Sequence, residues 1–172
     1  HRKDLDGIYI SGGEPLMHEG VVSFLQYAKT LNYKIKIHTN GMFYERLKTI
    51  LAQKLVDHVS LDIKNAPSAY AKTCGVEDMD LKDIEKSLDL LKQSVVPYDI
   101  CVTLVDELHN QETIEELGEW LQGVDTVILQ PFEDSETTID HSLHRPSFEV
   151  VLKYKNIFEK YVKHVKIRGD QA

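Results

Sequence analysis

Cysteine is scarce in this sequence, and that scarcity limits the metal chemistry that the chain itself can support. The 172 residues include two cysteines, Cys74 and Cys101, which lie far apart. No CxxC pair exists, so cysteine spacing alone predicts no metal site in this chain. Low cysteine content is typical of a reducing compartment, and we expect a cytoplasmic protein.

Long apolar runs and an excess of positive charge are also lacking. No run is long enough to span a bilayer, and the formal net charge of −8 opposes non-specific binding to nucleic acids or anionic membranes. We therefore expect neither nucleic acid nor membrane as a partner. A chain of this length with 42% hydrophobic residues can bury one good core, which favours a single domain over residues 1–172.

Short strand-like segments alternate with amphipathic helical segments along the whole chain. The predicted strands are Gly7–Ser11, Lys34–Thr39, Asp57–Ile63, Tyr98–Val105, Thr126–Gln130 and Lys163–Ile167. The predicted helices are Glu19–Leu31, Tyr44–Gln53, Leu81–Gln93, Gln111–Leu121 and Ser147–Tyr161. Regular alternation of this kind predicts an α/β fold with a mostly parallel sheet and right-handed crossovers.

The residue pattern within the strands distinguishes two kinds of α/β fold. In Lys34–Thr39 and Val59–Lys64, apolar and polar residues alternate, so each strand has one apolar and one polar face. Central strands of a doubly wound sheet would be apolar on both faces, and a closed barrel would have a packed apolar interior. We therefore predict an open, partial (β/α) barrel of about six strands, with helices outside and a polar face that is solvated or lines a cavity.

The segment Ile8–Pro15 is the most informative motif of the chain. It reads as a strand that ends at Gly12 and Gly13 and is followed by Glu14 and Pro15. Two glycines let the backbone adopt positive φ and approach a ligand closely, and a carboxylate there suits an amino group. Proline limits where the next helix can begin. Taken alone, the motif favours an ordinary strand-to-helix loop, and the polar ends of the later strands change that balance.

Polar residues also follow the later strands, and parallel strands gather such groups at one edge of the sheet. The predicted ligand-binding residues are Ser11, Gly12, Gly13, Glu14, Thr39, Asn40, Asp62 and Lys64. Asp62 suits ribose hydroxyls and Lys64 suits a carboxylate, so the set would fit a zwitterion joined to a ribose. Two alternatives stay open: Asp62 and Lys64 could pair with each other, and Thr39-Asn40-Gly41 could be a generic turn.

These motifs resemble the radical S-adenosylmethionine (radical SAM) superfamily, and most closely the activating proteins of glycyl radical enzymes such as anaerobic ribonucleoside-triphosphate reductase. The matching segments are Asp6–Pro15, Thr39–Gly41, Val56–Lys64 and Leu129–Phe132. The resemblance implies that Gly12, Gly13 and Glu14 receive the methionine amino group. It also implies that Asp62 and Lys64 contact the ribose and methionine portions.

The resemblance further implies the chemistry and its partners. In that family a reduced [4Fe–4S] cluster cleaves S-adenosylmethionine to a 5′-deoxyadenosyl radical, which removes a hydrogen atom from a glycine of the partner enzyme. The cofactors would be S-adenosylmethionine and the cluster. The partners would be a glycyl radical enzyme, here the anaerobic reductase, and an electron donor such as flavodoxin or ferredoxin. No residue need act as an acid, base or nucleophile, so we predict binding roles and no catalytic side chain.

Three departures from the family pattern are visible. The CxxxCxxC loop that ligates the cluster is missing, and the chain opens on His1 instead of Met, so we expect a piece of a longer protein without the first barrel strand. Relatives tend to have Asp at position 38 and Arg at position 101, where this chain has His38 and Cys101. We therefore expect a cation site beside the methionine carboxylate and an anion contact on the fourth strand to be lost.

These departures set the expectations for activity. We expect the chain alone to be inactive, to bind S-adenosylmethionine weakly or not at all, and to self-associate through the exposed Gly7–Ser11 edge. Two alternatives remain for the function. One is a radical SAM enzyme that acts on a small molecule, of the deazaguanine carboxylate synthase type. The other is a non-catalytic scaffold that keeps the barrel, which His38 and Cys101 favour.

Overall fold

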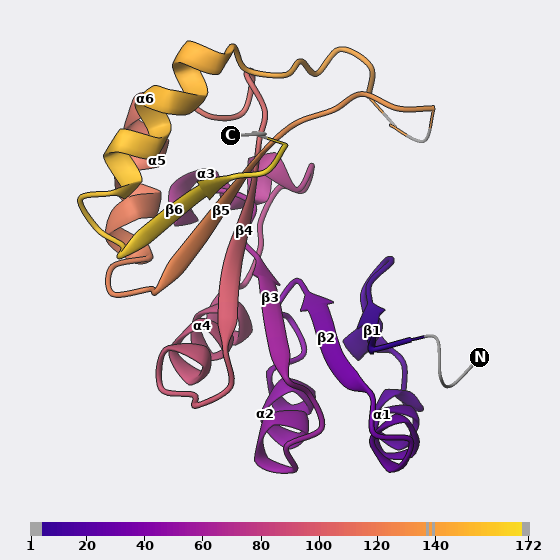
Figure 1. Cartoon of the computed structure of the whole chain (residues 1–172). Coiled ribbons are helices and arrows are strands. Elements are labelled where there is room, and N and C mark those ends of the chain that lie inside the picture. The colour runs from indigo at the N-terminus through magenta and orange to yellow at the C-terminus, as the bar shows by residue number, and fades with distance from the viewer. Residues whose placement is uncertain (1–4, 137, 139, 170–172) are drawn as a thin grey trace. The chain divides into compact units, whose positions relative to one another are not determined.

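The computed structural model describes residues 5–136, 138 and 140–169 (Figure 1). Six strands alternate with helices, and the sheet order is β1-β2-β3-β4-β5-β6. The strands are β1 (Gly7–Ile10), β2 (Lys34–Thr39), β3 (His58–Asp62), β4 (Tyr98–Leu104), β5 (Thr126–Pro131) and β6 (His164–Ile167). All six predicted strands are therefore confirmed, each within two residues of its predicted bounds, as is the parallel α/β class.

The helices are α1 (Val21–Thr30), α2 (Tyr44–Ala52), α3 (Pro67–Thr73), α4 (Lys82–Lys92), α5 (Gln111–Trp120) and α6 (Phe148–Phe158). A single 3₁₀ turn, η1 (Pro15–Met17), precedes α1. The five predicted helices are confirmed, and Ser147 caps α6 as its sequence context suggests, because its hydroxyl accepts from the Val150 N–H. The sequence pattern missed α3, since Tyr70 is the sole buried residue of this seven-residue helix.

The chain divides into two compact units, each made of two segments of the sequence. The first contains residues 1–62 and 80–99, and the second contains residues 63–79 and 100–172. The prediction of a single domain over residues 1–172 stays a prediction. Among the described residues, no helix combines the length and the apolar character needed to cross a membrane.

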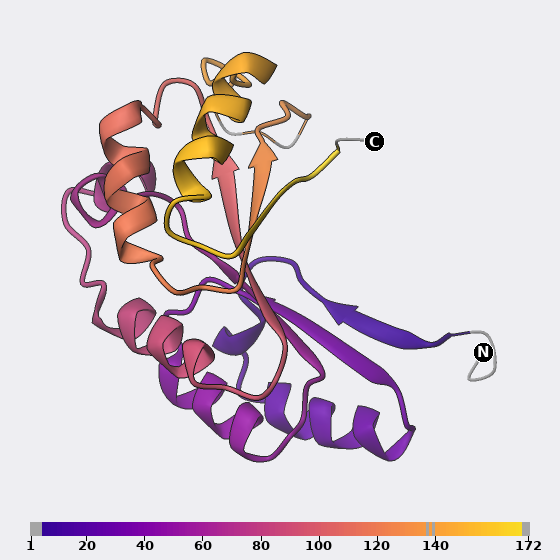
Figure 2. The ribbon, with the colours of Figure 1, turned by 60° about the vertical axis from the view of Figure 1, so that its left-hand side comes forward.

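In the first unit, β1, β2 and β3 are parallel neighbours. Ile10 lies opposite Ile37, and Thr39 lies opposite Leu61, so the carboxyl ends of the three strands reach the same edge. Figure 2 shows α1 and α2 on one side of these strands. The core between these layers is apolar, and its fully buried side chains include Leu25, Ile35, Ile37, Leu47, Ile50, Val59 and Leu61.

In the second unit, β4 pairs with β5, and β5 pairs with β6, again in parallel. The helices α5 and α6 pack side by side over these strands (Figures 1 and 2). Here the core comprises Ile100, Val102, Leu104, Ile114, Leu117, Val127, Leu129 and Phe158.

The predicted polar face is exposed at some positions and buried at others. Lys34 is exposed, but Ser60 on the same face is buried. The Ser60 hydroxyl donates to the carboxylate of Asp99, so a group of the neighbouring strand satisfies it in place of water.

Candidate functional site

The loop after β1 is shaped by its glycines and by Glu14. Gly12 has φ of 108°, a left-handed conformation that favours glycine, and it lets the chain turn away from the strand. Glu14 then caps η1, because its carboxylate accepts from the main-chain N–H of Leu16 at 2.9 Å. Pro15 occupies the first position of η1, where the missing N–H costs nothing. The helix α1 begins only at Val21, after Gly20 at its N-cap, two residues later than predicted.

The carboxylate of Glu14 also joins the ends of β1 and β2. Oε1 accepts from the Thr39 hydroxyl at 2.8 Å, and Oε2 accepts from the Asn40 main-chain N–H at 2.7 Å. A carboxylate has about four acceptor sites, and protein donors use three of them here. The geometry therefore gives Glu14 a clamping role that the sequence did not predict, and leaves little of its carboxylate for a ligand.

The segment Thr39-Asn40-Gly41 is both a turn and a part of this clamp. The side chain of Asn40 accepts from the Met42 N–H at 3.0 Å, which confirms the turn interpretation. Gly41 has φ of 79°, and a Cβ there would lie 2.8 Å from the Leu61 side chain, so only glycine fits without strain. The turn interpretation is confirmed, and the turn fixes the Asn40 N–H that Glu14 binds. Whether Thr39 and Asn40 also bind a ligand stays a prediction.

Asp62 and Lys64 follow β3. Thr39 lies opposite Leu61, so Asp62 is the next residue at the edge where Glu14 and Asn40 lie. Lys64 belongs to the second unit, and its carbonyl oxygen lies 3.0 Å from Nε2 of His109. The side chains of Asp62 and Lys64 are both half-buried. Whether Asp62 and Lys64 pair with each other stays a prediction.

A pocket of about 300 Å³ opens beside this loop in the first unit. Ser11, Gly12 and Gly13 line one wall, and Val21 and Phe24 of α1 line another. A Cβ built on Gly12 or Gly13 would meet no atom within 4 Å, so the glycines border open space. The volume of the pocket is at the small end of the range for ligand sites. Main-chain groups of Ser11–Gly13 line it, so it suits a small polar group of a ligand.

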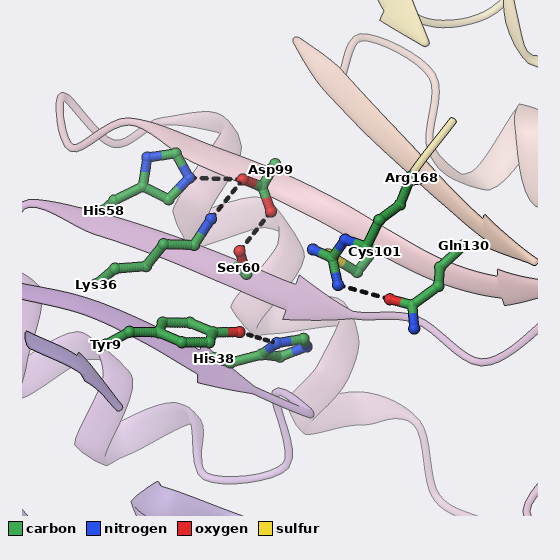
Figure 3. A network of polar contacts seen from close by, with 9 residues as sticks. All are labelled: Tyr9, Lys36, His38, His58, Ser60, Asp99, Cys101, Gln130 and Arg168. Atoms are coloured by element: carbon green, nitrogen blue, oxygen red, sulfur yellow. Dashed lines mark hydrogen bonds and ion pairs between the residues drawn. The ribbon is translucent and has the colours of Figure 1, made fainter. Parts of the chain in front are cut away.

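A network of polar side chains lies on one face of the first unit, across β2, β3 and the start of β4 (Figure 3). Asp99 is its centre: its carboxylate accepts from Ser60 at 2.5 Å, contacts His58 Nε2 at 2.7 Å, and pairs with Lys36 at 3.1 Å. Burial alone would raise the pKa of Asp99, but these three partners outweigh burial and lower it. Asp99 therefore stays charged, and it holds Lys36 and His58 in place.

On the same unit, Tyr9 and His38 form a second polar pair. The hydroxyl of Tyr9 lies 2.8 Å from Nδ1 of His38, as Figure 3 shows. His38 is half-buried, and the His58 side chain is 32% exposed.

In the second unit, a guanidinium lies beside Cys101. Arg168 follows β6, and its Nη1 donates to the Gln130 side chain at 2.6 Å. Its Nη2 lies 4.0 Å from the sulfur of Cys101 (Figure 3). The predicted loss of an anion contact at position 101 did not foresee this, because Arg168 is 67 residues away along the chain. A cationic group from the segment after β6 thus lies near Cys101, and the expected loss of an anion contact at position 101 stays a prediction.

The described residues do not fit an iron–sulfur cluster. They contain no group of three or more histidine, cysteine or acidic side chains that could hold a metal ion. Cys74 is exposed and Cys101 is buried. Such clusters are held by several cysteine thiolates, so two distant cysteines are too few.

Comparison with known proteins shows the family to which this chain is similar. The sequence model of the family described as "Radical SAM superfamily" matches residues 1–122. The Methanocaldococcus jannaschii protein named "Putative glycyl-radical enzyme activating enzyme MJ1227" is 30% identical over 169 residues, which are 95% of this chain and 70% of that protein.

Solved structures show the same fold. A domain of pyruvate-formate lyase-activating enzyme from Bacteroides vulgatus has a TM-score of 0.73 at 20% identity, covering 95% of this chain and 99% of that chain. A radical SAM methyltransferase from Sphaerobacter thermophilus has a TM-score of 0.72 at 17% identity, covering 96% and 52%. SuiB of Streptococcus suis, solved with S-adenosylmethionine, has a TM-score of 0.71 at 14% identity, covering 95% and 39%.

The chain therefore belongs to the radical SAM superfamily, whose members use S-adenosylmethionine and a [4Fe–4S] cluster. Within that superfamily it is a homologue of a glycyl-radical enzyme activating enzyme, which confirms the coarser part of the family prediction.

Proposed function

We propose that this chain is the S-adenosylmethionine-binding part of an activase that acts on a glycyl radical enzyme. The observation that carries the proposal is the loop of Gly12 and Gly13, which Glu14 clamps against β2 and which borders an open pocket. A preformed main chain at a pocket wall can bind a small polar ligand without first being ordered. The homology to an activating enzyme supplies the reaction class.

The residues divide the binding between them. The carbonyl groups of Ser11–Gly13 would accept from the methionine ammonium, while the carboxylate of Glu14 holds their loop in shape. Asp62 would bind the ribose hydroxyls, and Lys64 would bind the methionine carboxylate. Thr39 and Asn40 support the clamp. Bound S-adenosylmethionine supplies the radical chemistry, and the protein orients it and excludes water.

Catalysis by this chain needs cluster ligands that its own sequence does not offer. We propose that the 172 residues alone bind S-adenosylmethionine weakly and form no 5′-deoxyadenosine, because two cysteines cannot hold the cluster. The partner would be an anaerobic ribonucleotide reductase, with flavodoxin or ferredoxin as the electron donor.

The decisive experiment uses the protein that contains this chain at its full natural length. It is reconstituted anaerobically with iron and sulfide, reduced, and assayed for 5′-deoxyadenosine and for a glycyl radical by electron paramagnetic resonance. A glycyl radical on the anaerobic reductase supports the proposal. A radical on a different glycyl radical enzyme would correct the partner. Turnover without radical transfer to any of them would favour a small-molecule enzyme, and no turnover would favour a scaffold.

The loop itself can be tested with Gly13→Ala in that enzyme. The added methyl meets no protein atom within 4 Å, so the fold should not change. A ligand held against the main chain would be displaced, and an overpacked methyl costs about 1–3 kcal/mol, so the affinity for S-adenosylmethionine should fall about tenfold. Calorimetric titration measures the change.

Gly20→Ala is the matched control. Gly20 lines the same pocket outside the motif, and a Cβ there also meets nothing within 4 Å. We expect its affinity to stay within about twofold of the wild type, which is within roughly 0.5 kcal/mol. Equal affinities for the two variants and the wild type would place the ligand elsewhere.

A further inference from the structure

A buried histidine of the second unit forms a hydrogen bond with the main chain of the segment that follows β3. His109 is 4% exposed and lies in the loop between β4 and α5. Its Nε2 lies 3.0 Å from the carbonyl oxygen of Lys64. Because a carbonyl oxygen can only accept, Nε2 must carry the proton of this bond.

The other ring nitrogen is compatible with the same tautomer. Nδ1 of His109 lies 3.1 Å from the main-chain N of Val105 and 3.2 Å from its carbonyl oxygen, and in the neutral imidazole with its proton on Nε2 it accepts from the Val105 N–H. The neutral imidazole thus connects the end of β4 with the main chain of Lys64. A second buried side chain makes a parallel connection: Asn65 donates to the carbonyl of Leu108 at 2.7 Å.

We propose that His109 is a positioning residue for Lys64, fixing its main chain so that the ammonium group meets the ligand at a set position. The proposal rests on the proposed function, which makes Lys64 a ligand residue. Nothing in the sequence marked His109, because its partners lie 45 and 4 residues away along the chain. The lysine contributes the charge, and the histidine fixes the backbone from which that charge extends.

The electrostatics of the loop agree with this geometry. Burial lowers the pKa of His109 more than its bonds to the carbonyls of Val105 and Lys64 raise it. The hydroxyl of Tyr154 of α6 donates to the His109 carbonyl at 3.0 Å. Nε2 keeps the N–H that donates to the Lys64 carbonyl in both protonation states, so this bond should not change with pH.

Two substitutions separate positioning from plain stability. His109→Phe fills the space but has neither polar atom, so it loses both bonds. His109→Gln keeps an N–H that can reach the Lys64 carbonyl, so it should restore the connection in part. Ile114→Val, a buried change on α5 that removes no hydrogen-bonding group, is the control for a general loss of stability.

The first readout is amide hydrogen exchange over residues 62–66 in the full-length protein, measured by mass spectrometry. Exchange there should rise about tenfold in His109→Phe, by less in His109→Gln, and not selectively in Ile114→Val. An equal, global rise in His109→Phe and Ile114→Val would overturn the proposal.

The second readout is the affinity of the reconstituted enzyme for S-adenosylmethionine. We expect a loss of about tenfold in His109→Phe, comparable to that in Lys64→Met, with partial recovery in His109→Gln. Wild-type affinity in His109→Phe would overturn the proposal. If Lys64→Met also binds normally, the proposed ligand role of Lys64 is wrong, whereas the exchange data still decide whether His109 holds the segment.

Discussion

At the scale of single residues, half-buried carboxylates join neighbouring strands in the first unit. Glu14 joins the ends of β1 and β2, and Asp57, which directly precedes β3, joins the beginning of β3 to the beginning of β2. The carboxylate of Asp57 accepts from Lys29 at 2.7 Å, from the Ile35 N–H at 2.8 Å, and from Lys34 at 3.2 Å. Partial burial would raise the pKa of Asp57, but these bonds lower it to about 2.

This low pKa makes a prediction about acid stability. A carboxyl group with a folded pKa of about 2 and a usual value of 3.8 stabilises the fold above pH 4, and the contribution is lost as the pH falls toward 2. Asp57→Asn should therefore lower the free energy of unfolding by about 1–2 kcal/mol at pH 7, and by much less at pH 2. Urea denaturation across this pH range measures the difference.

The control for this prediction is Asp83→Asn. Asp83 pairs with Lys86 on the exposed face of α4 at 3.2 Å, and exposed pairs contribute little. Its free energy of unfolding should stay within about 0.5 kcal/mol of the wild type at every pH. A stability gap for Asp57→Asn that does not change between pH 7 and pH 2 would contradict the assigned role of Asp57.

At the scale of elements, a glycine decides how α5 packs. Gly118 lies in the last turn of α5, and a Cβ there would overlap the ring of Tyr161, which follows α6. The hydroxyl of Tyr161 donates to Glu115 of the same helix at 3.0 Å. The missing side chain of Gly118 therefore lets Tyr161 lie flat against α5 and bond to it.

Gly118→Ala separates packing from helix propensity. Alanine favours a helix over glycine by about 1 kcal/mol, but overpacking costs about 1–3 kcal/mol. We expect a net loss of stability in Gly118→Ala, measured by thermal unfolding. In a Tyr161→Leu background the loss should shrink or reverse, because the ring is gone. A stabilised Gly118→Ala single variant would show that Tyr161 can move at little cost.

At the same scale, the regular elements were predictable and α3 was not. The helix α4 has Ile84, Leu88 and Leu91 buried at helical spacing, which the sequence shows directly. The short α3 buries one residue, so no period exists to detect. Asp99 was missed for a different reason: the partners that make it the centre of a network lie on β2 and β3, 39 or more residues away.

At the scale of the whole molecule, the strand order places β1 at one end of the sheet. Tyr9 on this strand is 54% exposed, and edge strands with apolar side chains pair readily with other chains. We predict that the 172-residue chain self-associates as its concentration rises. Light scattering over a concentration series measures this, and a constant monomer mass would contradict it.

Tyr9→Lys tests whether β1 is responsible. A charged side chain on an edge strand opposes pairing, so this variant should stay monomeric at higher concentrations than the wild type. Tyr27→Lys is the matched control, because Tyr27 is 62% exposed on α1 and not on a strand. If both variants associate equally, the contact between chains does not involve the edge strand β1.

The sequence by itself determined the alternation of strands and helices, because hydrophobic spacing is a local property of the chain. It also determined that the loop after β1 can turn at Gly12, since the freedom of glycine needs no partner. Only the tertiary structure decided what Glu14, Asp99, His109 and Arg168 do. Each acts through groups that lie 25 to 67 residues away, and a hydrogen bond depends on where folding brings those groups.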